Sequence, residues 1–355
     1  MLPVEKQYGK RIIKDIRTNL HIMKKRLHTF WSTSFILILA ACLFSKESNS
    51  QSLIVGNEKS RFEIGINVGP SFFLGDLGGH RGKGTRFIKD LNLPLTQIMI
   101  GAFATFYPNE WLGIRAAAQY GQIESADRLI TTKGNDELYR KQRNLDFRSK
   151  IEEAYVAAEV FPLMFLNAGM EDYKPRWRPY GVIGIGYLHF SPQGSLTDAN
   201  GKKTWYYLRP LHTEGQGFPE YPQRKEYSLS QINIPMGVGV KFYLSERINI
   251  SGEILLRKSF TDYIDDVSTE YIDPNLFDKY LSPQDAIIAR QISDKVFAIV
   301  NPGLSRNSPG TQRGNPNQND SYFTTFLKFG IRLGPIYDNR YNRNVATRMR
   351  CPARF

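Results

Sequence analysis

The residues of this 355-residue chain that are best suited to chemistry lie in one acidic run, TDYIDDVSTEYID, at residues 261–273. Its carboxylates are those of Asp262, Asp265, Asp266, Glu270 and Asp273. Closely spaced carboxylate oxygens are the ligands that Ca²⁺ takes in proteins, but the run lacks the spacing and central glycine of an EF-hand. We therefore expect an ordered loop whose carboxylates pair with nearby Arg or Lys, with calcium binding as the alternative.

No motif in the sequence places a nucleophile beside a general base. Beyond residue 50 the sequence has three histidines, namely His80, His189 and His212. The sequence also has no phosphate-binding glycine loop at a strand-to-helix junction and no Cys/His cluster with metal-ligand spacing. We expect no enzyme activity, no catalytic residues, no cofactor and no bound metal. A hypothesis that stays open is an outer-membrane enzyme, such as a hydrolase, that acts on lipid or peptide. Alanine replacement of His189 and His212 without loss of function would argue against it.

Charged residues also recur along segments that have the alternation of β-strands. They are Glu63, Glu153, Glu159, Glu253, Arg115, Lys241, Arg257, Lys328 and Arg332. If eight such strands close into a barrel, its interior is only wide enough for its own side chains. A charge buried there must be paired. We therefore expect a salt-bridged plug, with an ion or proton path as the alternative.

The elements that position these residues are clearest at residues 231–257, QINIPMGVGVKFYLSERINISGEILLR. Every second residue from Ile232 to Phe242 is apolar, and the other face carries Asn, Pro, Gly and Lys. The alternation resumes after a tight break at 244–247. A period of two predicts strands, and runs of about 9–11 residues suit tilted membrane-spanning strands. A soluble β-sandwich would share the alternation, but glycines and full charges on the second face favour a barrel.

The same pattern predicts eight strands, at residues 61–68, 97–107, 112–123, 151–161, 180–190, 231–243, 248–257 and 322–333. Long connections at 75–95, 124–149, 191–225 and 259–320 alternate with shorter ones at 108–111, 162–178 and 244–247. Bacterial barrels have long extracellular loops and short periplasmic turns. The sequence therefore predicts an all-β fold, an eight-stranded antiparallel transmembrane β-barrel with both termini in the periplasm.

Two finer features accompany this fold. A short helix is expected in the last loop, because Ser282 can cap it, Pro283 suits its first position and Asp285 falls in its first turn. Aromatic residues at the predicted strand ends are expected to form an interfacial girdle. These aromatics are Phe106, Tyr107, Trp111, Phe161, Tyr180, Phe242 and Tyr243.

The first fifty residues are interpreted as a targeting segment. From Met23 a basic stretch, an apolar stretch at 35–44 and small residues before Gln51 form a signal peptide. We take Met23 as the true start and residues 51–335 as the barrel. Cleavage near Ser50 is preferred over lipidation of Cys42. We expect a protein of the outer membrane of a Gram-negative bacterium.

Removal of residues 1–50 would also change the charge of the chain. These residues hold nine Lys/Arg and three Asp/Glu, so the net charge falls from +13 to +7. That excess is too small to indicate a nucleic-acid partner.

Residues 336–355 form a basic tail with five Arg and one Asp. One interpretation is a solvated periplasmic end that helps orientation or insertion. The other is a docking segment for a periplasmic partner. The candidate partner-binding residues are Arg340, Arg343, Arg348, Arg350, Cys351, Pro352 and Phe355.

Five stretches together resemble a known family. They are PYGVIGIGYLHFSPQG at 179–194, LRPLHTEGQG at 208–217, IPMGVGVKF at 234–242, SFTDYIDDVSTEY at 259–271 and the terminal RCPARF. The resemblance is to an outer-membrane β-barrel family of the phylum Bacteroidota that includes PorG, a component of the type IX secretion system. It covers about residues 60–355. The most specific residues are Thr213, Glu214, Gly215, Gln216 and Gly217, and Thr261, Asp262, Tyr263, Asp265 and Asp266.

The resemblance implies a non-enzymatic accessory or anchoring role in type IX secretion. The partners would be outer-membrane lipid and the periplasmic ring made by a lipoprotein and its partner. Contacts with that ring would fall on the turns at 108–111, 162–178 and 244–247 and on the tail. Because paralogues share the pattern, the alternative is an outer-membrane binding module whose long loops hold a ligand or a surface partner.

Overall fold

The computed structural model describes residues 62–77, 93–130, 135–166, 175–198, 200–245, 247–296 and 307–333. All of them belong to one compact unit, residues 58–355. The predicted targeting segment at 1–50 and the basic tail at 336–355 lie outside the described residues.

Eight long strands and one short strand make up the sheet. The long strands are β1 (Phe62–Leu74), β2 (Gln97–Phe106), β3 (Leu112–Ala126), β4 (Asp146–Val160), β5 (Trp177–Thr197), β7 (Ser230–Tyr243), β8 (Ile248–Ser259) and β9 (Ser321–Leu333). The short strand is β6 (Lys203–Tyr207). The helices are α2 (Asn135–Arg143), α3 (Pro162–Leu166), α4 (Asn275–Tyr280) and α5 (Pro283–Ser293), with short 3-10 turns at Leu93–Leu95, Asp127–Leu129 and Arg209–Leu211.

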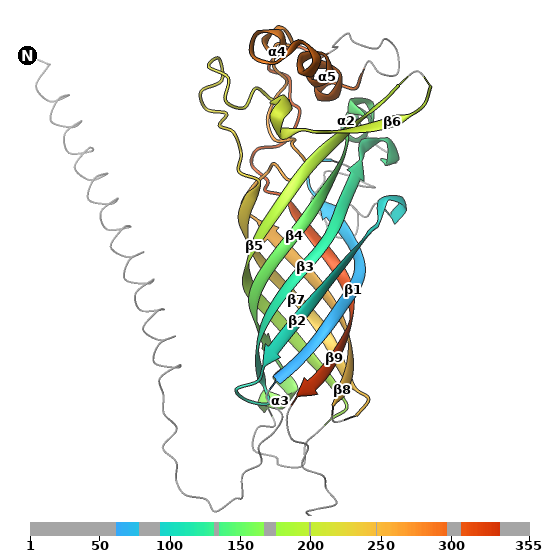
Figure 1. Ribbon diagram of the computed structural model, residues 1–355, viewed down its shortest axis with the longest axis vertical. Coiled ribbons are helices and arrows are strands. Elements are labelled where there is room, and N and C mark those ends of the chain that lie inside the picture. The colour runs from blue at the N-terminus through green and yellow to red at the C-terminus, as the bar shows by residue number, and fades with distance from the viewer. Residues whose placement is uncertain are drawn as a thin grey trace, which may run out of the picture. The chain divides into compact units, whose positions relative to one another are not determined.

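The eight long strands close into an antiparallel barrel. The strand order is β4-β3-β2-β1-β9-β8-β7-β5, and pairing of β4 with β5 completes the ring. β1 pairs with β9, so the first and last strands are neighbours. β6 pairs with β5 beyond the ring. Figure 1 shows α2, α4, α5 and β6 gathered at one end, here called the loop end, and α3 at the other, here called the turn end.

All eight predicted strands are present, and the predicted eight-stranded antiparallel barrel is confirmed. The strands run further toward the loop end than expected, since β3 continues to Ala126, β4 begins at Asp146 and β5 continues to Thr197. β6, α2, α3 and α4 were not predicted. Above the membrane both faces of a strand can be polar, so the alternation that marks the lower parts of these strands fades there.

The predicted helix of the last loop is α5. Pro283 is its first residue, and the Ser282 side chain accepts a hydrogen bond from the backbone N–H of Asp285 at 3.2 Å. The capping residue was therefore predicted correctly. α4, directly before it, begins after Pro274 without a side-chain cap, and so lacks the signal that revealed α5.

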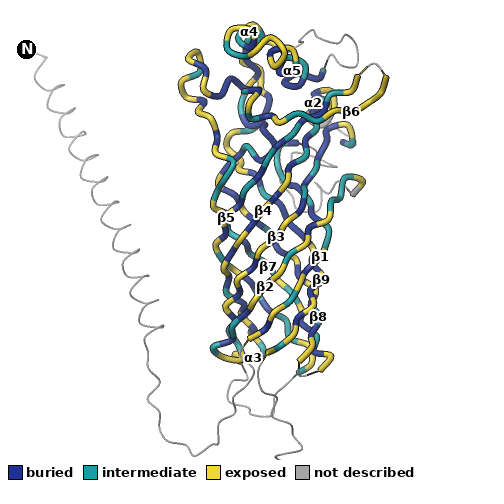
Figure 2. Tube along the Cα trace, viewed as in Figure 1, coloured by how far each residue is buried: buried dark blue, intermediate teal, exposed yellow. Residues whose placement is uncertain are grey.

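Exposed and buried residues alternate along the strands (Figure 2), and the exposed positions are mainly apolar while many of the buried ones are polar or charged. Large apolar side chains on every barrel strand are exposed, including Ile64, Ile98, Ile114, Val156, Ile185, Val238, Ile254 and Leu327. So continuous an apolar belt would be unfavourable in water and is suited to lipid. No helix in the described residues is long and apolar enough to cross a membrane.

The predicted aromatic girdle is only partly present. Phe106, Trp111 and Phe242 are half-buried and lie at the turn end as expected. The prediction is wrong for four other residues, Tyr107, Phe161, Tyr180 and Tyr243, which are buried. Tyr180 and Tyr243 occupy inward positions of β5 and β7, and Tyr107 and Phe161 directly follow β2 and β4. All four rings pack close to the lumen cations, for example Lys241 over the rings of Tyr107, Phe161 and Tyr180.

One group of charges fills the lumen toward the turn end. Arg115 pairs with Glu159 and with Glu253, whose Oε2 lies 2.8 Å from Arg115 Nη2. Lys328 Nζ lies 3.1 Å from the same Glu253 oxygen. Lys241 Nζ donates to Glu63 Oε1 at 2.9 Å. Each cation therefore has a carboxylate within reach, as a buried charge requires.

A second group lies further toward the loop end. Arg257 Nε donates to Glu153 Oε2 at 3.1 Å, and Asn233 Nδ2 donates to Glu153 Oε1 at 2.6 Å. Arg257 also donates to Gln119 and Thr324. Of the nine predicted lumen charges, eight are between 0 and 3% exposed, and Arg332 is half-buried. The predicted salt-bridged plug is confirmed.

Inner-face glycines make room for this plug. A Cβ atom at Gly239 would come 2.6 Å from the ring of Tyr180, and one at Gly330 would come 2.6 Å from Glu63 Oε1. Alanine at either position would therefore displace a member of the charged network. These two inner-face glycines are therefore explained by the space that the network needs.

We expect the purified protein to carry no steady ion current across a planar lipid bilayer. The reason is that paired charges and aromatic rings occupy the lumen of a barrel this small. Single-channel recording at neutral pH is the measurement. Stable conductance steps that depend on Glu253 or Arg115 would contradict this expectation and favour the ion-path alternative.

Candidate functional site

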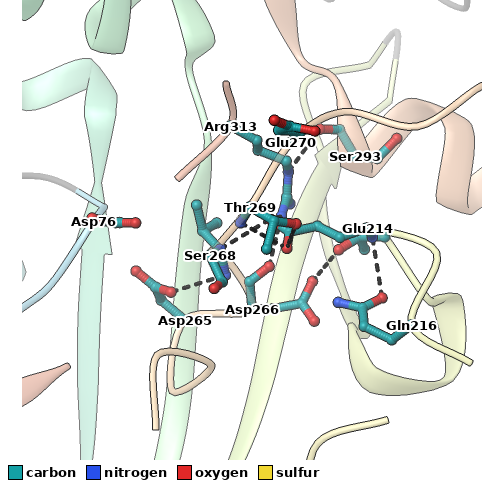
Figure 3. A network of polar contacts seen from close by, with 12 residues as sticks. Asp76, Glu214, Gln216, Asp265, Asp266, Ser268, Thr269, Glu270, Ser293 and Arg313 are labelled. Atoms are coloured by element: carbon teal, nitrogen blue, oxygen red, sulfur yellow. Dashed lines mark hydrogen bonds and ion pairs between the residues drawn. The ribbon is translucent and has the colours of Figure 1, made fainter. Parts of the chain in front are cut away.

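The two most specific motif runs meet at the loop end of the barrel (Figure 3). Residues 213–217 come from the loop between β6 and β7, and residues 261–269 follow β8. Arg313, from the segment before β9, joins them. We call this group, Thr213, Glu214, Asp266, Ser268, Thr269 and Arg313, the clasp.

Glu214 is the centre of the clasp. Its Oε1 accepts from the backbone N–H of Ser268 at 3.0 Å and from Arg313 Nη1 at 2.8 Å. Its Oε2 accepts from the backbone N–H of Thr269 at 3.0 Å and from the Thr269 hydroxyl at 2.8 Å. Glu214 is 0% exposed. A carboxylate with four donors is a fully satisfied buried charge, so its role here is to join three loops.

Asp266 also connects the segments of the clasp through hydrogen bonds. Its carboxylate accepts from the Thr213 hydroxyl and from the Tyr227 hydroxyl, the latter at 2.7 Å. Its backbone carbonyl accepts from Arg313 Nη1 at 2.6 Å. Asp266 has a φ of 64°, in the left-handed region that Asp tolerates better than most residues. The bonds to its side chain hold it in that conformation.

The remaining residues of the TEGQG run shape the turn that delivers Glu214. Gly215 and Gly217 have φ of 72° and 83°, which favours glycine at both positions. The Gln216 side-chain oxygen accepts from the backbone N–H of Glu214 at 3.1 Å. The family resemblance singled out the two glycines and Gln216, and the structure explains them by positive φ angles and by the hydrogen bond that fixes the turn.

The second motif run is ordered by its own side chains. The Thr261 hydroxyl accepts from the backbone N–H of Tyr263 at 3.2 Å. Asp265 accepts from the backbone N–H groups of Val267 and Leu77, at 3.0 and 3.1 Å. Tyr263 stacks on Tyr227 with ring centroids 4.8 Å apart. The predicted ordered loop is therefore confirmed.

The predicted pairing of its carboxylates with Arg or Lys is mostly wrong. It holds for Glu270, whose Oε2 lies 3.1 Å from Arg224 Nη2. The side chains of Asp265, Asp266 and Asp273 instead accept from hydroxyl or backbone N–H groups. Both carboxylate oxygens of the buried Asp262 lack a hydrogen-bond partner among the described residues. Burial without a cation favours the neutral acid, which removes the need for an ion pair.

Four carboxyl groups gather here, from Asp76, Asp262, Asp265 and Asp320. Burial, followed by the neighbouring carboxylates, raises the pKa of Asp265 and of Asp320 well above the ordinary range. In the described part of the chain, no group of three or more His, Cys, Asp or Glu side chains is arranged to hold a metal ion. Burial and the neighbouring carboxylates also raise the pKa of Asp76 and Asp262, so all four groups favour the neutral acid.

The stability of the clasp should fall as the pH rises from about 5 to 8. Burial, then Asp76, raises the pKa of Asp262 to about 8, and burial raises the pKa of Asp266 to about 7. An unfolded Asp has a pKa of about 3.9, so the folded loop holds extra protons between these values and loses that stabilisation as they leave. Hydrogen exchange of residues 261–272 across this range measures it. Asp262→Asn should flatten the dependence, and protection that increases with pH would contradict it.

Sequence reasoning missed one juxtaposition on the outer wall. His189 of β5 and Ser230 of β7 are direct partners across the sheet, and His189 Nδ1 lies 2.9 Å from Ser230 Oγ. The two residues are 41 positions apart, so no local motif could reveal a nucleophile beside a base. A strand register predicted for both strands would have done so. His212 instead lies in the loop, with its Nδ1 2.5 Å from the Gln216 carbonyl oxygen.

A cleft of about 830 Å³ opens beside the clasp. Tyr263, Thr269 and Glu270 of the second motif run line it, together with Gln231 and residues 223–228, 312 and 314–317. Tyr263 is half-buried, and the amide side chains around it are mostly exposed. The clasp therefore fixes the wall of a concave, partly aromatic surface at the loop end.

Comparisons with known proteins give structural similarities alone. No family profile matches the sequence, and no curated protein is similar to it. Neisserial surface protein A is a similar solved structure, with 8% identity and a TM-score of 0.32 over 77% of this chain and 97% of that one. Ail, the attachment invasion locus protein of Yersinia pestis, has 8% identity and a TM-score of 0.32 over 78% of this chain and 99% of that one. A major outer membrane protein from Thermus thermophilus has 9% identity and a TM-score of 0.34 over 77% of this chain and 99% of that one.

The chain's own structure decides its class. A closed barrel, apolar outside and charged inside, satisfies all of its backbone groups within the ring and leaves no strand edge in lipid. That is the architecture with which bacterial proteins cross the outer membrane. This chain is an eight-stranded outer-membrane β-barrel.

Proposed function

We propose that this barrel is an accessory, anchoring component of the type IX protein secretion machinery. Its turn end and basic tail would contact the periplasmic ring made by a lipoprotein and its partner. The observation that carries the proposal is the pair of runs TEGQG and TDYIDDVS, which resemble the secretion family in sequence and bind each other in the clasp.

The geometry supports anchoring over transport. Paired charges fill the lumen, so the barrel offers substrates no evident route through its centre. The clasp ties the loop between β6 and β7 to the segment after β8 and to the segment before β9, which gives the loop end a fixed shape. A plugged barrel in the membrane is suited to holding other components in place, and the turns at the opposite end are the surfaces left for a periplasmic partner.

Deletion of the gene is the direct test of this role. We expect secretion of type IX cargo to fall and the periplasmic ring to lose its attachment to the outer membrane. Cargo is measured in the culture supernatant, and ring attachment by membrane fractionation. Unchanged secretion together with an attached ring would overturn the proposal.

The cleft beside the clasp favours a second candidate, a binding module that holds a ligand or surface partner at the loop end. Tyr263 offers an aromatic face and Gln231 and Asn315 offer amide groups at one concave surface. Tyr263→Ala and Gln231→Ala would then abolish function, while removal of residues 336–355 would leave it intact. The opposite result favours the anchor.

A further inference from the structure

The outer wall of the barrel carries a row of polar side chains across four neighbouring strands. Tyr120 of β3 pairs with Glu152 of β4, Glu152 with His189 of β5, and His189 with Ser230 of β7. Directly opposed residues point to the same face of a sheet. Tyr120 and Glu152 are exposed and His189 and Ser230 are half-buried, so this face is the outer one.

This row lies where the wall changes from apolar to polar. Two residues closer to the turn end, the same face carries Ala118, Ala154, Tyr187 and Ile232. Two residues closer to the loop end, it carries Gln122, Lys150 and Ser191. In a membrane such a boundary falls between acyl chains and headgroups. The row is therefore level with the ester bonds of membrane lipids.

An apolar groove begins at this row. A groove of about 770 Å³ is lined by Tyr120, Glu152 and His189 of the row, by apolar residues nearer the turn end, and by Asn67, Gln119 and Glu153. Ser230 is not part of this lining but is the cross-strand partner of His189, which is. A second, of about 1190 Å³, shares Ala118, Ala154 and Tyr187 with the first and continues to Ile232. Short side chains at Ala102, Ala104, Ala116, Ala118 and Ala154 form its floor. Because the groove lies within the apolar belt, an acyl chain of a membrane lipid is the occupant that it fits.

We infer that Ser230 and His189 form a catalytic pair that hydrolyses ester-linked acyl chains of lipids in the leaflet at the loop end. Their geometry is that of a nucleophile and its base, 2.9 Å apart, a distance at which the base can take the hydroxyl proton. The inference departs from the expectation of no catalytic residues. It rests on the barrel alone and not on the role in secretion.

The reaction balances with water as the second substrate. Ser230 Oγ attacks the ester carbonyl carbon while His189 Nδ1 takes its proton. The ester C–O bond breaks, His189 returns that proton to the departing alcohol oxygen, and an acyl ester remains on Ser230. Water then attacks this ester, with His189 taking a proton from the water and giving it to Ser230 Oγ. The products are a fatty acid and the deacylated lipid.

Glu152 is the positioning residue for this pair. Directly opposed side chains have Cβ atoms about 4.5–5.5 Å apart, so the longer Glu152 carboxylate can reach the second ring nitrogen of His189 by a side-chain rotation. A carboxylate there would hold the tautomer whose Nδ1 is free to accept a proton. Glu152→Gln should then lower kcat while KM for the lipid stays unchanged, and Glu152→Asp should restore part of the rate.

The test uses the full chain, reconstituted into vesicles of phosphatidylethanolamine or of lipid A with the same phospholipid. Release of fatty acid is measured for the wild type, Ser230→Ala, His189→Ala and Ser321→Ala. Ser321 is the matched control, because it lies half-buried on β9 opposite the exposed Lys258, and within the described part of the chain no histidine is hydrogen-bonded to it. Folding of each variant is checked by the shift between unheated and heated protein on a gel.

We expect fatty acid release by the wild type and by Ser321→Ala, and a loss of about 100-fold or more in Ser230→Ala and His189→Ala. A fluorophosphonate probe should label Ser230, as read by peptide mass spectrometry. Release from one vesicle type only identifies the lipid. No release from either vesicle together with no adduct on Ser230, or equal release by folded Ser230→Ala, would overturn the inference. The secretion proposal is tested separately: a variant that loses type IX secretion but keeps lipase activity would bear on the anchoring role and would leave this inference supported.

Discussion

Glu153→Ala is expected to destabilise the barrel by about 3–5 kcal/mol, the cost of leaving a buried partner charge unpaired. Glu153 is the carboxylate that pairs with the buried Arg257, and Asn233 also donates to it. Unfolding by urea in lipid vesicles, followed by tryptophan fluorescence, measures the difference.

The neighbouring Glu152 provides the control. It follows the strand alternation outward and is exposed, so Glu152→Ala should change stability by within about 0.5 kcal/mol. Replacing both members of the buried pair, as Glu153→Leu with Arg257→Met, should recover much of the loss because no charge is then left alone. Equal effects at Glu152 and Glu153 would mean that the lumen network does not stabilise the barrel.

Glu214→Ala is expected to open the loop end while leaving the barrel closed. The change removes the acceptor of four hydrogen bonds and leaves the buried Arg313 without its carboxylate. The loss of folding free energy is on the order of 3–5 kcal/mol and is confined to the clasp and the loops that it joins. Limited proteolysis should cut residues 261–320 much faster, while the gel shift that reports the closed barrel stays unchanged.

Glu220→Ala is the matched variant in the same loop. Glu220 makes its ion pair with Lys279 at the surface, and exposed pairs of this kind contribute little. Its proteolysis should resemble that of the wild type. If Glu214→Ala leaves the loops as resistant as Glu220→Ala does, the clasp does not hold the loop end together.

The barrel could be predicted because one constraint acts along every strand. A residue in the wall must face either lipid or a narrow interior, and a period of two records that choice, as Val238 and Val240 alternate with Gly239 and Lys241 on β7. The inward position of the lumen charges could be predicted for the same reason, because they occupy the second face of the same alternation. Beyond the membrane the constraint disappears, so β6 and the outer ends of β4 and β5 carried no comparable signal.

The candidate site could be predicted only in part. The motif runs singled out Glu214 and Asp266, but sequence spacing could not show that they meet through Arg313, 99 residues from Glu214. The acidic run suggested ion pairs, whereas burial left Asp262 and Asp265 without them. The pair His189 and Ser230 depends on register between β5 and β7, which local sequence does not reveal.

The most direct test of the anchoring role is to crosslink cells, extract the tagged protein in mild detergent and identify what co-purifies. The wild type and Glu214→Ala should both recover the periplasmic ring lipoprotein and its partner, because the clasp lies at the opposite end of the barrel. A chain lacking residues 336–355 should lose them. Recovery of the barrel alone, from cells whose type IX secretion is active, would contradict the account and favour a loop-binding module.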